Sequence, residues 1–224
     1  MRLKLTCESR RPGQSLPLNH QYELSSYIYH RLAAADPAFA TMLHDRGFTL
    51  TERDDRCFKF FTFSNVFVPR NKGKLRGRTL KIFAIGTARF QAISPIFVSK
   101  STDASKGLSC HEFIATSEED YHQYFIQNLL NKYNVARKHG LVEGKEVGAS
   151  EINLNINNPT AAKRKLQKLM MGKKGETNII GYQYQFQLSA PPAVLQTGYL
   201  GGWGGKNAQG FGMSKVLDTK YTSR

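Results

Sequence analysis

The most informative stretch of this 224-residue chain is Gly201-Gly202-Trp203-Gly204-Gly205-Lys206-Asn207-Ala208-Gln209-Gly210-Phe211-Gly212-Met213. Dense glycine lets the backbone adopt positive φ angles and approach a ligand closely. Successive free N–H groups can then form an anion-binding nest, to which Lys206 adds a compact charge for phosphate. Trp203 and Phe211 are expected either to pack beneath this loop or to stack on a base.

Two common nucleotide-binding motifs are excluded for this glycine-rich segment. A P-loop ends in Gly-Lys-Ser/Thr, and the segment lacks that ending. A dinucleotide fingerprint needs a strand–turn–helix setting, whereas a strand is predicted here over residues 211–217. Glycine richness alone is ordinary loop chemistry, so a functional interpretation needs support from the rest of the chain.

The net charge gives that support. Thirty-two Lys and Arg face 17 Asp and Glu, for a formal charge of +15. Such an excess favours a polyanionic partner, because neutralising phosphates releases counterions. A membrane is the competing polyanion, but no basic amphipathic helix, no apolar run near the roughly 20 residues of a span and no signal peptide is evident. We therefore expect a cytoplasmic, nucleic-acid-binding protein with no membrane partner.

Cysteine and acidic residues indicate neither a metal nor a cofactor. Cys7, Cys57 and Cys110 are scattered singly, without the paired spacing of a structural zinc site or a disulfide framework. We expect them to be small buried residues in a reducing compartment. No cluster of Asp and Glu resembles a two-metal nuclease site. We expect no metal site and no cofactor.

Hydrophobic periodicity and turn signals divide the chain into helices and strands. Asp36-Pro37 supplies an N-cap and a first-turn proline for a helix over residues 37–45, which ends near Gly47. Ser117-Glu118-Glu119-Asp120 resembles a capping box at the start of a longer helix that ends near Gly140. Further helices are expected from residue 19 to 32 and over 191–200, and strands over 1–7, 57–69, 79–85, 89–98, 151–156, 178–188 and 211–217.

The order of these elements indicates an α+β fold with two tandem ferredoxin-like (RRM-like) units. The N-terminal unit is expected over residues 1–93 and the C-terminal unit over residues 94–224. A complete first unit carries a second helix between its third and fourth strands, but only Gly86-Thr87-Ala88 separates those strand candidates. Either the first unit is reduced, or a segment is absent from the sequence.

Five motifs in order resemble those of the CRISPR-associated repeat-processing endoribonucleases, which belong to the repeat-associated RNA-binding superfamily. The first is the glycine-rich segment, with Lys206-Asn207 followed by Gly210-Phe211-Gly212-Met213. The others are Leu16-Pro17-Leu18-Asn19-His20-Gln21-Tyr22 with Ile28-Tyr29, Leu43-His44-Asp45-Arg46-Gly47-Phe48, Ser94-Pro95-Ile96, and Asn128-Leu129-Leu130-Asn131-Lys132-Tyr133. The resemblance implies two units that face each other across a basic cleft, with the glycine-rich loop near the RNA.

The resemblance also implies an activity, which is metal-independent cleavage of a CRISPR precursor transcript within its repeats to give crRNAs. Such cleavage needs a base for the 2′-OH proton, an acid for the leaving 5′-oxygen, and cations or donors for charge on the phosphorane. The expected products are a 2′,3′-cyclic phosphate (or the 3′-phosphate formed by its hydrolysis) and a 5′-hydroxyl.

His44 is the expected general acid or base, because imidazole titrates near neutral pH and the last turn of a helix favours its protonated form. The resemblance places the catalytic histidine of several family members at this residue. Tyr29 matches a tyrosine that pairs with that histidine in some members, although it can equally orient the 2′-OH or a phosphate oxygen, because a phenol is ordinarily a poor base. Some relatives carry a lysine just beyond the histidine, but this chain has none there. The charge stabiliser stays open among Arg46, Arg53 and Lys59.

RNA binding is expected from the glycine-rich segment and from a basic run in the second half of the chain. Cations can lie against the phosphates of a deep A-form major groove, although many charge runs are only solvated faces. A weaker basic cluster comprises Arg10, Arg11, Lys72, Lys74, Arg76 and Arg78. The residues expected to contact RNA are Gly202, Trp203, Gly204, Lys206, Asn207, Gly210, Phe211, Gly212, Lys163, Arg164, Lys165 and Lys168.

A non-catalytic RNA-binding subunit of the same superfamily is the alternative. It would share the fold, the charge and the glycine-rich loop, and the matches at Tyr29 and His44 argue against it. The two hypotheses differ in whether these residues approach the loop across one cleft. The partner is expected to be CRISPR repeat RNA, and the sequence leaves open whether the protein acts as a monomer, a homodimer or a part of a CRISPR surveillance complex.

Overall fold

The computed structural model describes residues 20–51, 57–64, 86–101, 111–169 and 177–220. It contains a four-stranded antiparallel sheet in the order β4-β7-β1-β8. Two further sheets are the pairs β2–β3 and β5–β6. The expected α+β class is therefore confirmed. The strands are β1 (Thr87–Ala92), β2 (Ser99–Ser101), β3 (His111–Phe113), β4 (Asn153–Ile156), β5 (Lys163–Leu169), β6 (Thr177–Gln183), β7 (Gln185–Ser189) and β8 (Ser214–Lys220).

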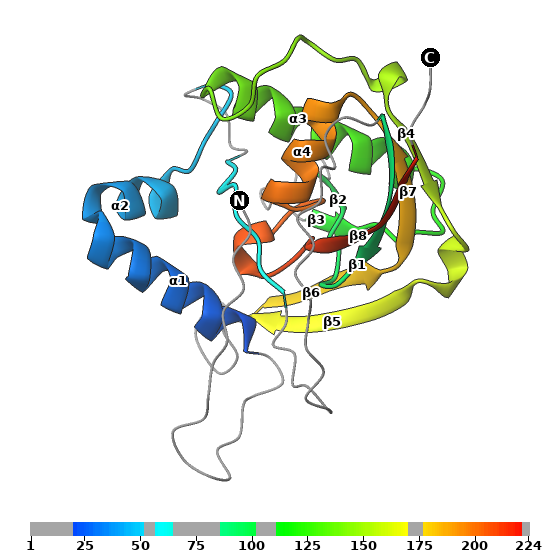
Figure 1. Ribbon diagram of the computed structural model, residues 1–224. Helices are drawn as coiled ribbons and strands as arrows, with labels where there is room; N and C mark the ends of the chain where they lie inside the picture. Colours follow the sequence, from blue (N-terminus) through cyan, green and yellow to red (C-terminus); the bar gives the residue numbers. More distant parts are fainter. Residues whose placement is uncertain (1–19, 52–56, 65–85, 102–110, 170–176, 221–224) are drawn as a thin grey trace, which may run out of the picture.

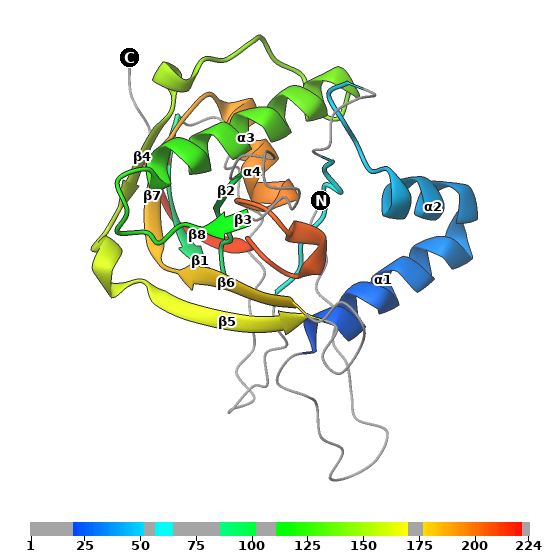
Figure 2. The same cartoon turned by 180° about the vertical axis from the view of Figure 1, so that it is seen from behind.

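The helices form two groups (Figures 1 and 2). α3 (Tyr121–Lys138) and α4 (Pro192–Gly201) contact each other beside the four-stranded sheet, while α1 (Gln21–Ala35) and α2 (Pro37–Asp45) contact each other at one side of it. Three short 3-10 turns complete the described elements: η3 (Ala149–Glu151), η4 (Pro159–Ala161) and η5 (Asn207–Gln209). None of the helices in the described part of the chain is long and apolar enough to cross a membrane.

The main core gathers around Trp203, the single tryptophan of the chain. Its ring centroid lies 4.9 Å from that of Phe90 on β1, 5.4 Å from Phe186 on β7 and 6.1 Å from Phe125 on α3. The indole N–H donates to Ser214 Oγ at 2.7 Å, so the one polar atom of the buried ring is paired. The glycine-rich segment is thereby anchored in the core.

Local signals were right at both ends of α2 and at the end of α3, which stops at Lys138 before Gly140 (φ +66°), but wrong at the start of α3. The Asp36 carboxylate accepts a hydrogen bond from Phe39 N–H at 2.9 Å, and Gly47 adopts φ +64° just beyond the helix. The expected capping box at Ser117 is wrong, because α3 begins only at Tyr121. Glu118 instead accepts from Ala115 N–H at 2.6 Å, so its carboxylate serves the preceding turn.

Two expected strands need correction, and β5 was not expected at all. Residues 57–64 are irregular, with one bridge between Phe58 and Phe48, because Phe60 has φ +51° and interrupts the extended backbone. Residues 178–188 form two strands, β6 and β7, in different sheets. β5 was missed because only Gln167 is buried among residues 163–168, which leaves no apolar alternation to detect. The expected strands at residues 1–7, 65–69 and 79–85 lie outside the described residues.

The strand β1 lies at the centre of the sheet, between β7 and β8. Phe90 pairs with Phe186 on one side and with Val216 on the other. β1 precedes the expected boundary at residues 93 and 94, yet both of its partners come from the second half of the chain.

Gly198 provides a test of the packing around Trp203. A Cβ on Gly198 would lie 2.0 Å from Cζ3 of the indole, so alanine there must displace the ring. We expect Gly198→Ala to lower the free energy of unfolding by about 2–3 kcal/mol through overpacking. Urea unfolding followed by tryptophan fluorescence measures the change. Gly148→Ala is the matched control, because its Cβ would meet only Ser150 Oγ at 3.6 Å; equal midpoints for the two variants would contradict the packing argument.

Candidate active site

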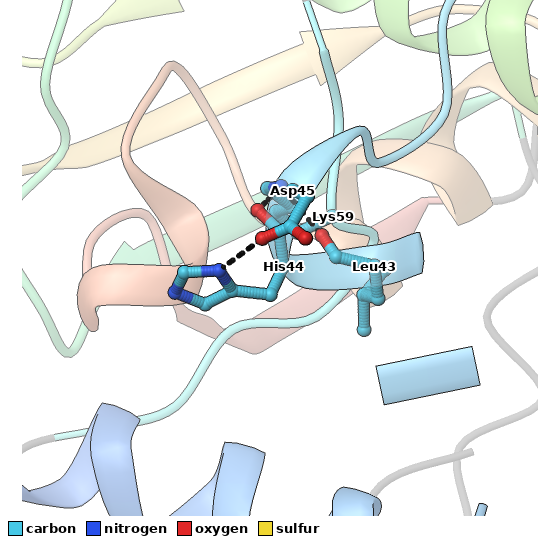
Figure 3. Close-up of polar contacts among 4 residues, drawn as sticks. All are labelled: Leu43, His44, Asp45 and Lys59. Atoms are coloured by element: carbon cyan, nitrogen blue, oxygen red, sulfur yellow. Dashed lines mark hydrogen bonds and ion pairs between the residues drawn. The ribbon is translucent and has the colours of Figure 1, made fainter. Parts of the chain in front are cut away.

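The end of α2 carries His44 and is held by Lys59 (Figure 3). The Lys59 ammonium donates to the carbonyl oxygens of Leu43 and His44, at 2.5 Å each. The last carbonyls of a helix lack partners within it and carry partial negative charge, so a cation placed there stabilises the final turn. Lys59 therefore fixes the turn that presents His44.

The His44 ring is exposed and makes a polar contact with its neighbour in sequence. Its Nδ1 lies 2.8 Å from Asp45 Oδ1, and the two side chains are 67% and 62% exposed. An ionised carboxylate only accepts hydrogen bonds, so this contact places a proton on Nδ1 and leaves Nε2 for a substrate.

Tyr29 lies against the same histidine. The ring centroids of Tyr29 and His44 are 5.0 Å apart with an interplanar angle of 82°, and Phe61 contacts the other side of the tyrosine at 5.6 Å. Burial raises the pKa of Tyr29 above its ordinary value, and the nearby Cys57 thiol adds to the increase. The phenol therefore stays protonated at neutral pH and is a hydrogen-bond donor there.

A cavity of about 900 Å³ joins this pair to the glycine-rich segment. α1 contributes Tyr29 to its wall, α2 contributes His44, and α3 contributes Lys132. Lys206 and Asn207 come from the glycine-rich segment. The expected approach of Tyr29 and His44 to this segment is thus observed.

Close backbone packing explains the glycines of the segment. Gly204 has φ +65°, and a Cβ there would lie 2.2 Å from the carbonyl oxygen of Phe97. Gly212 has φ +78°, and its Cβ would lie 2.1 Å from the carbonyl oxygen of Trp203. Both positions exclude any side chain because protein backbone, not a ligand, occupies the space.

Lys132 is the residue that sequence reasoning missed. It is 1% exposed, and its ammonium donates to the carbonyl oxygens of Gly202 and of Gly204 (3.0 Å) and to Asn207 Oδ1 (2.7 Å). Burial lowers its pKa to about 7, while the three acceptor oxygens favour the charged form. The available signal was its position: Lys132 follows Phe125 and Leu129 at helical spacing, on the buried face of α3.

The other predicted site residues are distributed as follows. Trp203 and Phe211 are buried, with 1% and 0% of their surface exposed. The expectation that they contact RNA by stacking on a base is therefore wrong, and the packing alternative is correct.

Cys57 is exposed on the cavity wall, contrary to the expected burial. Arg46 is exposed as the C-cap of α2. Lys163, Arg164, Lys165 and Lys168 are exposed on β5. Arg53, the weaker basic cluster, Cys7 and Cys110 lie outside the described residues.

Metal ligands do not cluster in the part of the chain that the structure describes. There, no group of three or more His, Cys, Asp or Glu side chains is arranged to hold an ion.

Family models match most of the sequence. The model described as CRISPR associated protein Cas6, C-terminal, matches residues 78–216, and the model described as CRISPR-associated protein Cas6, N-terminal, matches residues 15–95. A CRISPR-associated endoribonuclease Cas6 1 from Methanocaldococcus jannaschii is 24% identical over an alignment of 250 residues. The alignment covers 92% of this chain and 89% of the relative.

Solved structures agree with this chain in fold. A Cas6-related protein of Pyrococcus furiosus has a TM-score of 0.64 at 16% identity, covering 94% of this chain and 96% of its own. A RAMP protein described as binding different RNA substrates has a TM-score of 0.65 at 17% identity, with 93% and 95% covered. At such identities the likeness shows the fold alone.

Lys59→Met tests the support of the His44 turn. Removing the ammonium leaves the Leu43 and His44 carbonyls without their cation, so we expect α2 amides to exchange faster and the free energy of unfolding to fall by about 1 kcal/mol. Hydrogen–deuterium exchange resolved by peptide measures the effect. Lys145→Met, which removes an exposed charge outside the cavity, should leave α2 unchanged. Equal exchange of the α2 amides in the two variants would contradict the assignment of Lys59 to the support of the His44 turn.

Proposed function

The chain belongs to the CRISPR-associated Cas6 family, whose models match residues 15–95 and 78–216, and on that premise we propose that it is an endoribonuclease that cleaves CRISPR precursor RNA within the repeats. The observation that carries the proposal is that Tyr29, His44 and the glycine-rich segment line one cavity. The name of the Methanocaldococcus jannaschii relative supports the assignment to endoribonucleases.

The proposed reaction uses the substrate's own 2′-hydroxyl and no metal. The 2′-oxygen attacks the adjacent phosphorus while a base takes its proton, and the bond from phosphorus to the 5′-oxygen breaks as an acid protonates that oxygen. The products are a 2′,3′-cyclic phosphate, or the 3′-phosphate after hydrolysis, and a 5′-hydroxyl.

His44 transfers one of these protons through Nε2. The Asp45 carboxylate, 2.8 Å from Nδ1, orients the ring and leaves Nε2 to the substrate. The exposure of the ring lets an RNA backbone reach it without rearrangement of α2.

Tyr29 is assigned to orientation rather than to proton abstraction. Its pKa is raised by burial, so the phenol is a weaker acid than a free tyrosine and stays protonated near neutral pH. A protonated phenol beside His44 can donate to the 2′-oxygen or to a phosphate oxygen.

Lys59 is the best supported of the three charge candidates. It lines the cavity and contacts the His44 carbonyl, whereas Arg46 does not line the cavity. We propose that Lys59 both holds the His44 turn and adds positive charge beside the reacting phosphate.

The RNA path is proposed to run from this cavity over the basic surface. Lys206 lines the cavity with an exposed side chain and is the phosphate contact within the glycine-rich segment. The exposed β5 side chains Lys163, Arg164, Lys165 and Lys168 extend the positive surface for the repeat. The glycines at 202, 204, 210 and 212 shape the loop.

Two tandem ferredoxin-like units across a basic cleft remain the proposed architecture. The pairing of β1 with β7 and β8 favours a boundary before Thr87 rather than after residue 93. The proposed partner is CRISPR repeat RNA in the cytoplasm, with a homodimer or a surveillance complex as the larger assemblies to test.

His44→Ala tests the chemistry. In EDTA, the wild type should cleave a labelled repeat RNA, whereas the variant should be slower by about 10²–10⁴-fold, as for loss of a general acid or base. A 2′-deoxy substitution at the scissile nucleotide should stop cleavage while RNA binding persists. His122→Ala is the matched control, because that histidine lies on α3 outside the cavity. Tight binding without cleavage by the wild type would favour the non-catalytic subunit.

Tyr29→Phe tests the orienting assignment through pH. Because the raised pKa keeps the phenol protonated across the working range, its loss should lower the single-turnover rate by about tenfold at every pH and leave the shape of the pH profile unchanged. A profile that loses its acidic limb in the variant would instead identify Tyr29 as the base.

A further inference from the structure

Lys132 is a buried cation whose hydrogen bonds go to the glycine-rich segment. Its ammonium reaches two backbone carbonyls, of Gly202 and Gly204, and the side-chain oxygen of Asn207. An ammonium has three N–H donors, so these oxygens occupy its full capacity. Among the described residues no carboxylate pairs with this ammonium. Besides its hydrogen bonds, the ammonium lies 5.9 Å from the centroid of the Phe58 ring, a cation–π contact.

The same cation connects four parts of the cavity wall. Asn207, held through Oδ1, donates from Nδ2 to the carbonyls of Trp203 (3.2 Å) and Phe211 (3.1 Å). Thr62 Oγ1 donates to the Phe211 carbonyl at 2.7 Å. Ser25 Oγ of α1 donates to the Ala208 carbonyl at 2.7 Å. Lys132 thus sits at the centre of contacts that join α3, the glycine-rich segment, residues 58–62 and α1.

A cation buried without a counterion costs folding free energy, and a leucine or methionine would fill the same position on the helix. The three acceptors show what the charge does: it ties the carbonyls of Gly202 and Gly204 and the side-chain oxygen of Asn207 to α3. A carbonyl oxygen without such a partner repels a phosphate placed near it. The ammonium therefore fixes these oxygens and offsets their partial negative charge beside the cavity where RNA is proposed to bind.

We propose that Lys132 is a positioning residue whose ammonium holds the glycine-rich segment in the shape that receives RNA phosphate, so that RNA binding and retention of this proton favour each other. The inference rests on the proposed function for its ligand, but the coupling between the proton and the loop is testable without RNA.

The pKa of Lys132 determines how RNA affinity is expected to change with pH. Its pKa is about 7 in the free protein, so the ammonium is lost as the pH rises through that value. A phosphate at the loop favours the ammonium, so RNA affinity falls as pH rises, by up to about tenfold per pH unit. The other titratable groups on the cavity wall are Tyr22, Tyr29, His30, His44, Cys57, Lys59, Tyr124 and Lys206, and the only carboxylate among the described lining residues is Asp45.

Trp203 supplies the first test, because the single tryptophan lies inside the loop network. Its fluorescence is titrated across neutral pH, without RNA, in the wild type, Lys132→Met and the exposed-charge control Lys145→Met. A transition near the Lys132 pKa should appear in the wild type and the control and be absent from Lys132→Met. The wild type and Lys132→Met differ only in this side chain, so an identical transition in Lys132→Met, or none in the wild type, overturns the proposal.

RNA binding supplies the second test, with repeat RNA made uncleavable by a 2′-deoxy scissile nucleotide. Lys132→Met should bind about tenfold more weakly at acidic pH and lose the pH dependence that the wild type shows. Lys132→Arg should keep affinity and lose the pH dependence, because a guanidinium does not lose its proton.

The variants distinguish a failure of the proposed function from a failure of the Lys132 coupling. A wild type that neither binds nor cleaves repeat RNA removes the proposed function, and the RNA-free titration still decides the loop coupling. A wild type that cleaves RNA while Lys132→Met keeps the same pH dependence of binding removes the coupling alone. If Lys132→Met does not fold, Lys132→Arg gives the decision, since a pH transition that survives in it cannot come from Lys132.

Discussion

The burial of Trp203 is the constraint on which the rest of the structure depends. The indole lies among Phe90, Phe125 and Phe186, which come from β1, α3 and β7. Aromatic rings of this size dominate core energetics, so the ring fixes the start of the glycine-rich segment relative to the sheet. The start of the segment is thereby anchored to the core, and Gly204 and Gly212 are required because backbone approaches them closely, at Phe97 and at Trp203 itself.

The candidate site combines this rigid half with a more exposed one. His44 stands on a short helix that is secured at its start by Asp36 and at its end by Lys59. Those contacts fix the turn but leave the imidazole accessible. In the proposed function, a proton-transfer group needs such access to a substrate, whereas the segment proposed to bind phosphate needs a preorganised backbone. The cavity between them brings both properties together.

The sequence predicted those features that depend on local interactions. α2 was found because Asp36-Pro37 and Gly47 act within one turn of the chain. Tyr29 and His44 were chosen from the resemblance, and the structure places their rings 5.0 Å apart. β5 was missed because its side chains are mostly exposed, which leaves no apolar alternation. Residues 57–64 were wrongly predicted as a strand because Phe60 adopts φ +51°, which its residue type does not signal. Helical spacing could have indicated that Lys132 is buried, but its partners are carbonyls 70 or more residues further along the chain, which no local pattern identifies.

The central position of β1 has a kinetic consequence. Its partner β8 includes Val216, which pairs with Phe90 across a separation of more than a hundred residues. Pairings so distant in sequence close slowly, because a long loop must lose its conformational entropy before any contact compensates. During synthesis, β1 has an unpaired edge until residues 185–189 and 214–220 have emerged from the ribosome. The nascent chain therefore carries an exposed, aggregation-prone strand while residues 93–184 are being made, and the sheet is complete only after β8 has emerged as well.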